Sequence, residues 1–309
     1  MRRIVARLGA VSAALVVLAA CGGPQGSQGS QGSQHGGAPA GRLERLTATQ
    51  EAKLDRAEEL LIQRCMKRQN LTYWPDRLRT PDERKNVRLV LDDTRWARTY
   101  GYGGELHRRT QQERKKDPNS AYQRGLSEHG QQRWDRAFFG DEDSRSVSAP
   151  VPTGGRVSTS LDGCLAQGQD ILYGGLPRWF RVSKVAENLT GLYADDLKRD
   201  RRFRDAVHKW SRCMRGEGHD YATPEKIRDR LPELNERLSP DRAHAAEVRL
   251  AVAEAQCARS SELGRTAREL ERKYRDKAIG TRYRADVDTY LRLQHRALTT
   301  ADTVLADRG

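Results

Sequence analysis

The chain has 309 residues, and the roughly 270 that follow Gly41 are enough for one large domain or two small ones. Lys and Arg number 56 and Asp and Glu 42, so the formal net charge at pH 7 is +14. This charge favours an anionic partner, or else it belongs to a merely solvated, salt-screened surface. Nucleic acid is excluded as the partner if the chain is exported, which its N-terminus indicates.

The first 20 residues have the pattern of a secretory signal peptide. Arg2, Arg3 and Arg7 give a positively charged start without an acidic residue, and an apolar stretch follows over residues 8–18. A helix that spans the hydrocarbon core of a membrane needs about 20 apolar residues, and this stretch has about a dozen. The sequence therefore predicts a signal peptide at residues 1–20 and not a transmembrane anchor.

Cys21 follows this signal directly, at the end of the run Leu-Ala-Ala-Cys. The run is similar to a bacterial lipobox, in which small residues fit the peptidase and the thiol accepts a diacylglycerol. Two or three acyl chains hold a protein on a membrane, because each buried methylene contributes about 0.8 kcal/mol. The sequence thus predicts lipidation at Cys21 and a location at the outer face of the cell membrane. The alternative is an ordinary secretory signal with a chance cysteine.

Residues 21–42 form the predicted linker. Gly-Ser-Gln occurs three times in a row between residues 26 and 34, and this composition cannot bury a core. A flexible chain of about 20 residues spans roughly 25 Å, enough to lift a domain off the lipid. Loss of the three signal arginines lowers the net charge to +11. The expected partners are therefore the membrane, an anionic cell-wall polymer or an envelope protein.

From residue 43 onward the apolar spacing is mostly helical. Residues 47–69 place apolar side chains three or four apart, which predicts a helix that buries Cys65. A second helix is expected over residues 127–139, with Ser127 as its N-cap. Valines around a Gly-Gly turn predict a small β-hairpin within residues 147–158.

Helical periodicity resumes at residue 161 and continues to 192, and then from 197 to 215. The longest signal starts at Ser239-Pro240 and extends to Val304, with Gly264 and Gly280 as points where it can kink. We therefore expect a mostly α-helical, bundle-like domain over residues 43–309. Its C-terminal arm is expected to be a long helix or a helical hairpin.

Four cysteines follow the lipidated one: Cys65, Cys164, Cys213 and Cys257. An even number outside the cell suggests two disulfides, for which three pairings exist. Cys65 and Cys213 lie in matching Arg-Cys-Met contexts, each with a tyrosine eight residues later and then a proline. This repeat indicates a duplication, with halves 43–175 and 176–309. It favours one disulfide per half, which pairs Cys65 with Cys164 and Cys213 with Cys257.

Two alternatives for these cysteines remain. A zinc site is one, but no two of them have the short spacing typical of zinc ligands. A thiol nucleophile with a histidine partner is the other, because His219 lies six residues after Cys213.

Several motifs together resemble a group of actinobacterial lipoproteins and secreted proteins, many of them from streptomycetes. The group shares a Trp-x-x-Cys-Met run that ends in an aromatic residue, as at 210–221 here, and an Ala-rich helix with a second cysteine, as at 251–257. Pieces of 91–103 and 163–174 also match. The chain departs from the group's pattern at 69–71, where a glycine is common. No activity is established for the group, so the resemblance implies a location and a scaffold only.

A basic, aromatic stretch is the nearest thing to a binding site in the sequence. Its residues are Arg95, Trp96, Arg98, Tyr100, Tyr102 and Arg108. Flat rings among guanidiniums can stack on sugars and pair with anionic groups, and the interspersed glycines suit an exposed loop. The alternative is that the rings pack in the core beneath a basic rim. Two adjacent carboxylate pairs, Asp92-Asp93 and Asp195-Asp196, are expected to be helix caps.

Two kinds of function fit these observations. One is a non-catalytic binder of an anionic envelope polymer or of a partner protein, and the other is a cell-wall-modifying hydrolase with an unrecognised site. The sequence has no Gly-rich phosphate loop, no Gly-x-Ser-x-Gly and no His-Glu-x-x-His, and it predicts no cofactor or metal. A hydrolase needs at least one buried or clefted acid with a raised pKa, whereas a binder needs none. The sequence favours the binder.

Overall fold

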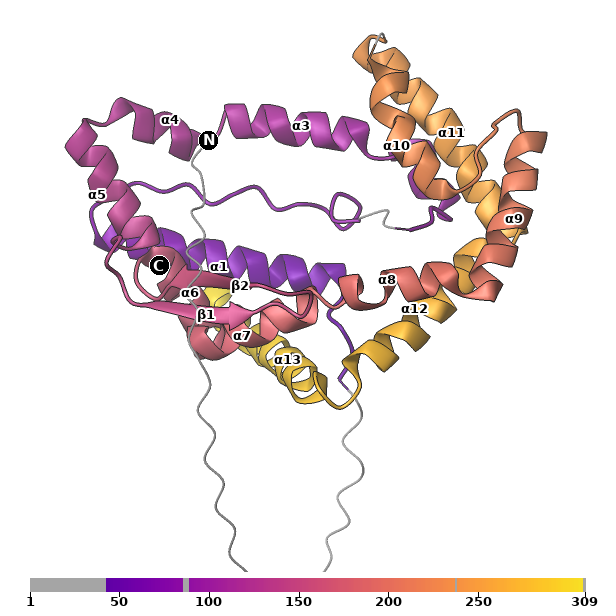
Figure 1. Ribbon diagram of the computed structural model, residues 1–309. Helices are drawn as coiled ribbons and strands as arrows, with labels where there is room; N and C mark the ends of the chain where they lie inside the picture. The colour runs from indigo at the N-terminus through magenta and orange to yellow at the C-terminus, as the bar shows by residue number, and fades with distance from the viewer. Residues whose placement is uncertain (1–42, 86–88, 237, 308–309) are drawn as a thin grey trace, which may run out of the picture. The chain divides into compact units, whose positions relative to one another are not determined.

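A computed structural model describes residues 43–85, 89–236 and 238–307, and these residues are mostly helical, as expected (Figure 1). The predicted signal peptide, Cys21 and the linker lie outside the described residues. The elements are α1 (Ala48–Arg68), α2 (Thr94–Tyr100), α3 (Gly104–Lys115), α4 (Pro118–Gly125), α5 (Glu128–Phe139), β1 (Ser146–Pro150), β2 (Arg156–Ser160), α6 (Cys164–Tyr173), α7 (Leu176–Glu187), α8 (Thr190–Arg199), α9 (Arg201–Gly216), α10 (Pro224–Asn235), α11 (Pro240–Ser260), α12 (Leu263–Ile279) and α13 (Arg284–Ala306).

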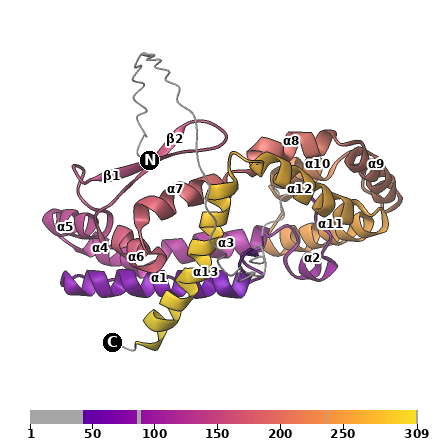
Figure 2. The same ribbon diagram turned by 90° about the horizontal axis from the view of Figure 1, so that it is seen from below.

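The first core forms where α1, α6, α7 and α13 pack together. A capping box starts α1, since Thr47 and Gln50 each accept a hydrogen bond from the other's backbone N–H. Leu54, Ala57 and Leu61 then follow at helical spacing and are buried in this core. Figure 2 shows α13 crossing α1, with which it is in contact. The first and last helices of the described chain therefore close the same core.

The second core is built from α8, α9, α11 and α12, with α2 packed on the outer side of α11. Trp210 on α9 is completely buried at its centre. Trp96 and Ala97 of α2 pack against the small residues Ala251 and Ala255 of α11, which let the two helices approach closely. The Ala-rich run in the sequence thus serves as a packing face.

The two cores do not follow the halves 43–175 and 176–309 that the sequence repeat suggested. Helices α2 and α3 precede residue 175 but pack on α11, whereas α7 and α13 follow it and pack in the first core. Residues 43–309 form one compact unit. Shorter segments of the two halves do share local geometry.

The ends of α1 and α9 are two such segments. In both, the backbone N–H five residues past the methionine donates to the methionine carbonyl, of Met66 at 3.0 Å and of Met214 at 2.8 Å. This closing pattern needs a residue with positive φ just after the helix, and Asn70 (φ 55°) and Gly218 (φ 81°) supply it. Asparagine tolerates this conformation better than other non-glycine residues. The first turn therefore has this geometry without a glycine.

The repeat extends to a side-chain hydrogen bond. Two residues before each cysteine, Gln63 donates to the carbonyl of Tyr73 at 3.1 Å, and Ser211 donates to the carbonyl of Tyr221 at 2.7 Å. Each bond ties the chain that leaves the helix back onto the helix itself. The matching sequence contexts thus encode one and the same exit turn.

Two disulfides join Cys65 to Cys164 and Cys213 to Cys257, which is the pairing that the repeat favours. They close loops with sequence separations of 99 and 44 residues. Loop-closure entropy gives each a stabilisation of roughly 4 to 5 kcal/mol. The partners are not equivalent, because Cys164 begins α6 whereas Cys257 lies near the end of α11.

The C-terminal arm is broken into α11, α12 and α13. Gly280 (φ 45°) ends α12, as expected. The first break comes at Glu262 (φ 62°) and not at Gly264, which lies inside α12, where the side chain of Asp92 leaves no room for a Cβ. The hairpin pairs β1 with β2 in antiparallel register, with Val147 opposite Thr159, and lies where the valines predicted it.

Candidate functional site

The aromatic rings of the expected binding stretch pack into the protein, so the exposed loop predicted there is not observed. Trp96 is 3% exposed, and its indole N–H donates to the carbonyl of Asp82 at 3.2 Å. The ring centroids of Tyr100 and Trp96 are 5.5 Å apart. Tyr102 donates its hydroxyl proton to the buried carboxylate of Glu254 at 2.7 Å. The alternative interpretation, core rings beneath a basic rim, therefore describes these residues.

The arginines of the same stretch do not converge on one point. Arg95 and Arg98 are exposed on α2. Arg108 on α3 pairs with Glu105 at 2.6 Å and also donates to the carbonyl of Pro240. The six predicted residues therefore form no common site.

The glycines of the stretch have a structural reason. The turn between α2 and α3 crosses α11 at Glu247, so closely that a Cβ on Gly101 would lie 2.9 Å from the Cβ of Glu247. Gly101 also has φ of 60°, which favours glycine. The N–H of Gly104 donates to the Glu247 carboxylate at 3.2 Å. This close crossing positions α3 beside the segment that follows α1.

A cleft of about 350 Å³ lies between that segment, α3 and α10. One face of α3 lines it at helical spacing, and the buried rings form part of its wall. The lining residues are Arg77, Arg79, Glu83 and Lys85 from the segment, Trp96 from α2, Tyr102 and Gly103 from the turn, Leu106, His107, Thr110, Gln111 and Arg114 from α3, and Arg228 and Leu231 from α10. We call this the cationic cleft.

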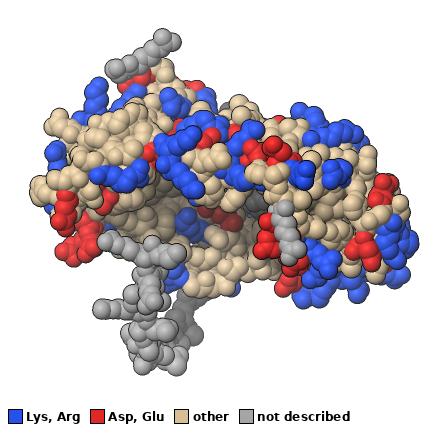
Figure 3. Space-filling view, turned by 90° about the horizontal axis from the view of Figure 1, so that it is seen from above, with Lys and Arg blue, Asp and Glu red and all other residues tan. Residues whose placement is uncertain are grey.

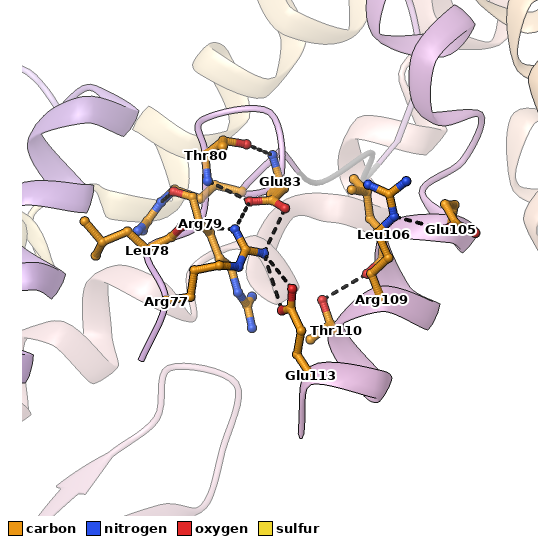
Figure 4. A network of polar contacts seen from close by, with 11 residues as sticks. Arg77, Leu78, Arg79, Thr80, Glu83, Glu105, Leu106, Arg109, Thr110 and Glu113 are labelled. Atoms are coloured by element: carbon orange, nitrogen blue, oxygen red, sulfur yellow. Dashed lines mark hydrogen bonds and ion pairs between the residues drawn. The ribbon is translucent and has the colours of Figure 1, made fainter. Parts of the chain in front are cut away.

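A polar network fixes the segment wall of the cationic cleft (Figure 4). The guanidinium of Arg77 makes two hydrogen bonds to Glu83, at 3.0 and 3.1 Å, and an ion pair with Glu113 of α3 at 3.2 Å. Glu83 also accepts from the N–H of Thr80 at 2.8 Å. These donors, Arg77 first, hold the pKa of Glu83 at about 2. The carboxylate therefore stays ionised at neutral pH and serves as a fixed partner for Arg77.

The cations of the cleft fall into two groups. Arg77 pairs with Glu83 and Glu113, Lys85 pairs with Asp93, and Arg228 pairs with Glu254 at 3.0 Å. Arg79 and Arg114, which come from two different segments, have no carboxylate partner among residues 43–85, 89–236 and 238–307. Two exposed guanidiniums thus share one cleft and are available to an anion from outside.

A larger cleft, of about 650 Å³, lies beside the Cys65–Cys164 disulfide, but its lining has two arginines against three aspartates. Arg133 donates to the carbonyl of Gln69 at 2.6 Å, and Arg136 pairs with Asp141 at 3.2 Å. Two further aspartates also line this cleft. It therefore offers less to an anion than the cationic cleft.

Burial raises the pKa of Glu254. A buried acid with a raised pKa is what a hydrolase would need, but the contacts of Glu254 give it a structural role. Its side chain is completely buried and accepts hydrogen bonds from the N–H of Leu91, the hydroxyl of Tyr102 and the guanidinium of Arg228. It does not line the cationic cleft. The carboxylate therefore joins three separate segments, and its oxygens are occupied.

The acidic pairs have different roles. Asp93 is the N-cap of α2, as expected, and its carboxylate accepts from the N–H of Trp96 at 3.0 Å. Asp195 and Asp196 lie inside α8 and do not cap it, and Asp196 pairs with Arg199 on the surface. The helix-cap expectation was therefore wrong for the second pair.

The cysteine alternatives do not apply either. Cys213 is bonded to Cys257, so its sulfur is not a thiol nucleophile beside His219. Within the described ranges, no three or more His, Cys, Asp or Glu side chains come together in a way that could hold a metal ion.

Sequence reasoning missed most of the cationic cleft: Arg77, Arg79, Glu83, Lys85, His107, Arg114 and Arg228. The usable signal was the spacing of residues 106, 107, 110, 111 and 114, which places them on one helical face. Figure 3 shows the molecule from above, where basic side chains, with acidic ones among them, spread over the side turned to the viewer and a hollow lies near its middle.

None of the helices in the described part is long and apolar enough to span a bilayer. Comparisons of the chain with models of known protein families, with curated proteins and with solved structures found no match.

Proposed function

We propose that this chain is a non-catalytic binder of an anionic polymer of the cell envelope, and that the cationic cleft is its binding site. The observation that carries the proposal is the pair Arg79 and Arg114, which lie in one cleft without carboxylate partners in the described chain. Guanidiniums bind phosphate and carboxylate groups through paired, charge-assisted hydrogen bonds. The network around Arg77 holds one wall in place before a ligand arrives, which reduces the entropy lost on binding.

The acid that lines the cleft supports binding over hydrolysis. Glu83 has its pKa held at about 2, so it carries no proton to donate at neutral pH. A general acid works best with a pKa near the operating pH. A binder, by contrast, needs the cleft to keep its charge, and the ionised Glu83 keeps Arg77 in position.

The predicted location supports the same function. A lipid on Cys21 and a linker of about 20 residues would hold the domain within reach of phosphate and carboxylate polymers outside the membrane. Mass spectrometry of the mature protein tests this part, with an acylated cysteine at its N-terminus as the expected result. If Cys21→Ser stays as firmly on the membrane as the wild type, the lipid anchor is refuted.

Retention of the mature chain on immobilised teichoic acid tests the binding function. We expect retention at about 20 mM salt that falls steeply by about 150 mM, where charges are screened over about 8 Å. Replacement of Arg79 and Arg114 together by glutamate should weaken binding at least about tenfold, or about 1.4 kcal/mol. The matched control replaces Arg95 and Arg98, two exposed arginines outside the cleft, in the same way.

The control separates a site from a general charge effect. If both double variants lose the same affinity, binding depends on net charge and the cationic cleft is not the site. If the wild type is retained at low salt neither on teichoic acid nor on a carboxylate polymer, an anionic polymer is not the ligand.

A further inference from the structure

One aromatic side chain close to the cationic cleft is exposed, although the other tryptophans are not. Trp74 is 40% exposed, whereas the remaining four of the chain's five tryptophans are at most 8% exposed. Large aromatic side chains are normally buried, because burial of the ring is strongly favourable. An exposed tryptophan beside a charged cleft therefore suggests a contact with a partner.

The backbone of Trp74 is held rigidly in this exposed position. The buried side chain of Asn119, on α4, accepts from the N–H of Trp74 at 2.9 Å and donates to its carbonyl at 2.8 Å. On either side, Glu59 of α1 accepts from the hydroxyl of Tyr73 and from the N–H of Asp76. A ligand that contacts the indole therefore does not have to order this part of the chain.

The ring itself has one aromatic neighbour. Tyr122 of α4 lies edge-on to it, with ring centroids 5.7 Å apart and planes at 70°. An edge-on neighbour fixes the tilt of the indole without covering it in a parallel stack. The exposed fraction of Trp74 agrees with a partly open ring.

Trp74 and the cationic cleft lie along one track. The segment after α1 runs antiparallel to α3 and α4, since Trp74 bonds to Asn119 and Arg77 pairs with Glu113 (Figure 1). On one side of this track Arg79 follows Arg77, on the other Arg114 lies between Asn119 and Glu113, and both arginines line the cleft. Five residues of extended chain span at most about 18 Å, so Trp74 and Arg79 lie within the reach of one polymeric ligand.

We infer that Trp74 is a stacking platform for a sugar ring, and that the ligand of the cationic cleft is an anionic glycan whose charged groups bind Arg79 and Arg114. This inference rests on the proposed function and names its ligand class. The apolar face of a pyranose ring can stack on an indole, whereas a polyanion without rings has no flat apolar group that could stack on Trp74. Such a polyanion would bind through the arginines alone.

Two probes with the same charged group and different backbones test this. Polygalacturonate carries its carboxylates on pyranose rings, and poly-γ-glutamate carries them on a ring-free chain. With the mature chain, Trp74→Ala should weaken binding of polygalacturonate at least about tenfold and change binding of poly-γ-glutamate by less than about twofold. Arg79→Glu with Arg114→Glu should weaken both. Phe139→Ala removes another exposed ring, away from the track, and should change neither.

Tryptophan fluorescence gives a direct readout. Because Trp74 is the accessible tryptophan, polygalacturonate should protect wild-type emission from acrylamide quenching, and poly-γ-glutamate should not. Trp74→Tyr keeps a ring and should restore most of the affinity lost in Trp74→Ala, which also excludes misfolding as the cause of that loss.

The outcomes separate the two claims. If Trp74→Ala weakens both polymers equally or neither, the stacking role is refuted while the anion site stands. If the wild type binds teichoic acid but not polygalacturonate, the glycan inference fails and the proposed function remains. If no polyanion binds, both fail.

Discussion

Removal of the buried Glu254 carboxylate should destabilise the domain strongly if this residue joins three segments of the fold. It accepts from Leu91 at 3.0 Å, from Tyr102 at 2.7 Å and from Arg228 at 3.0 Å. Glu254→Ala leaves all three donors without this acceptor. Breaking a buried ion pair by removing one partner costs about 3–5 kcal/mol. The total stability of a folded domain is about 5–15 kcal/mol, so this is a large share.

Urea unfolding at pH 7 with both disulfides intact, followed by circular dichroism, measures this loss. With a slope of about 1–3 kcal/mol per molar urea, the midpoint should fall by at least about 1 M. Glu233→Ala is the matched control, because Glu233 is exposed on α10, and it should stay within about 0.5 kcal/mol of the wild type.

Removal of the partner should make stability depend on pH. Burial raises the pKa of Glu254 from 4.5, and Arg228 acts against this, so Arg228→Ala raises the pKa further. A carboxyl with a raised pKa in the folded state stabilises the fold below the unfolded pKa of 4.5 and loses that contribution as the pH rises. Arg228→Ala should therefore be more strongly destabilised at pH 8 than at pH 5.

A Glu254→Ala variant within about 1 kcal/mol of the wild type would refute the structural role of this network. So would an Arg228→Ala variant with equal stability at both pH values. If a stable Glu254→Ala also abolished shortening of a wall polymer by the protein, the hydrolase hypothesis would replace the binder.

Three further predictions follow from the fold. Cys213→Ser with Cys257→Ser opens a 44-residue loop and should lower the free energy of unfolding, measured by chemical denaturation, by about 4 kcal/mol. A loss below about 1 kcal/mol would contradict the loop-closure argument. Asn70 has φ of 55°, so in thermal melts Asn70→Gly should stay within about 1 kcal/mol of the wild type. The β-branched Asn70→Val should lose about 1–2 kcal/mol of stability. Equal melting of the two variants would contradict the turn geometry. Arg77 and Thr80 lower the pKa of Glu83 from 4.5 to about 2, so this group stabilises the fold above pH 4.5 and that contribution is lost as the pH falls toward 2. Glu83→Gln should therefore flatten the acid limb of a stability–pH curve, and an unchanged limb would refute the pairing.

The long helix α1, which buries a stripe of apolar residues, could be predicted from the sequence, whereas α3 could not. In α1 the apolar residues recur every three or four positions because that face enters the first core. By contrast, α3 has no buried residue, so its sequence carries no apolar period, and the glycines at and before its start suggested an exposed loop. It is placed by the crossing of Gly101 over Glu247 and by the ion pair from Arg77 to Glu113, which are tertiary contacts.

The binding stretch was misplaced for a related reason. Sequence reasoning grouped Trp96, Tyr100 and Tyr102 because they are neighbours in the chain, but burial of such rings depends on the Ala-rich face of α11, more than 140 residues away. The cationic cleft joins residues 77–85 to residues 106–114 and to α10. No local sequence pattern predicts that these segments lie next to one another.

The exit turn that occurs twice sets the start of two of these segments. At the first turn, Tyr73 is hydrogen-bonded to α1, and the chain then continues into the segment that supplies Arg77 and Arg79 to the cleft. At the second turn, Tyr221 is hydrogen-bonded to α9, and the chain then continues into α10, which supplies Arg228. The same turn, with a disulfide at the end of its helix in both places, therefore comes before one wall of the cleft each time. The repeat that the sequence displays as a cysteine motif thus fixes where two distant segments that line the cleft leave their helices.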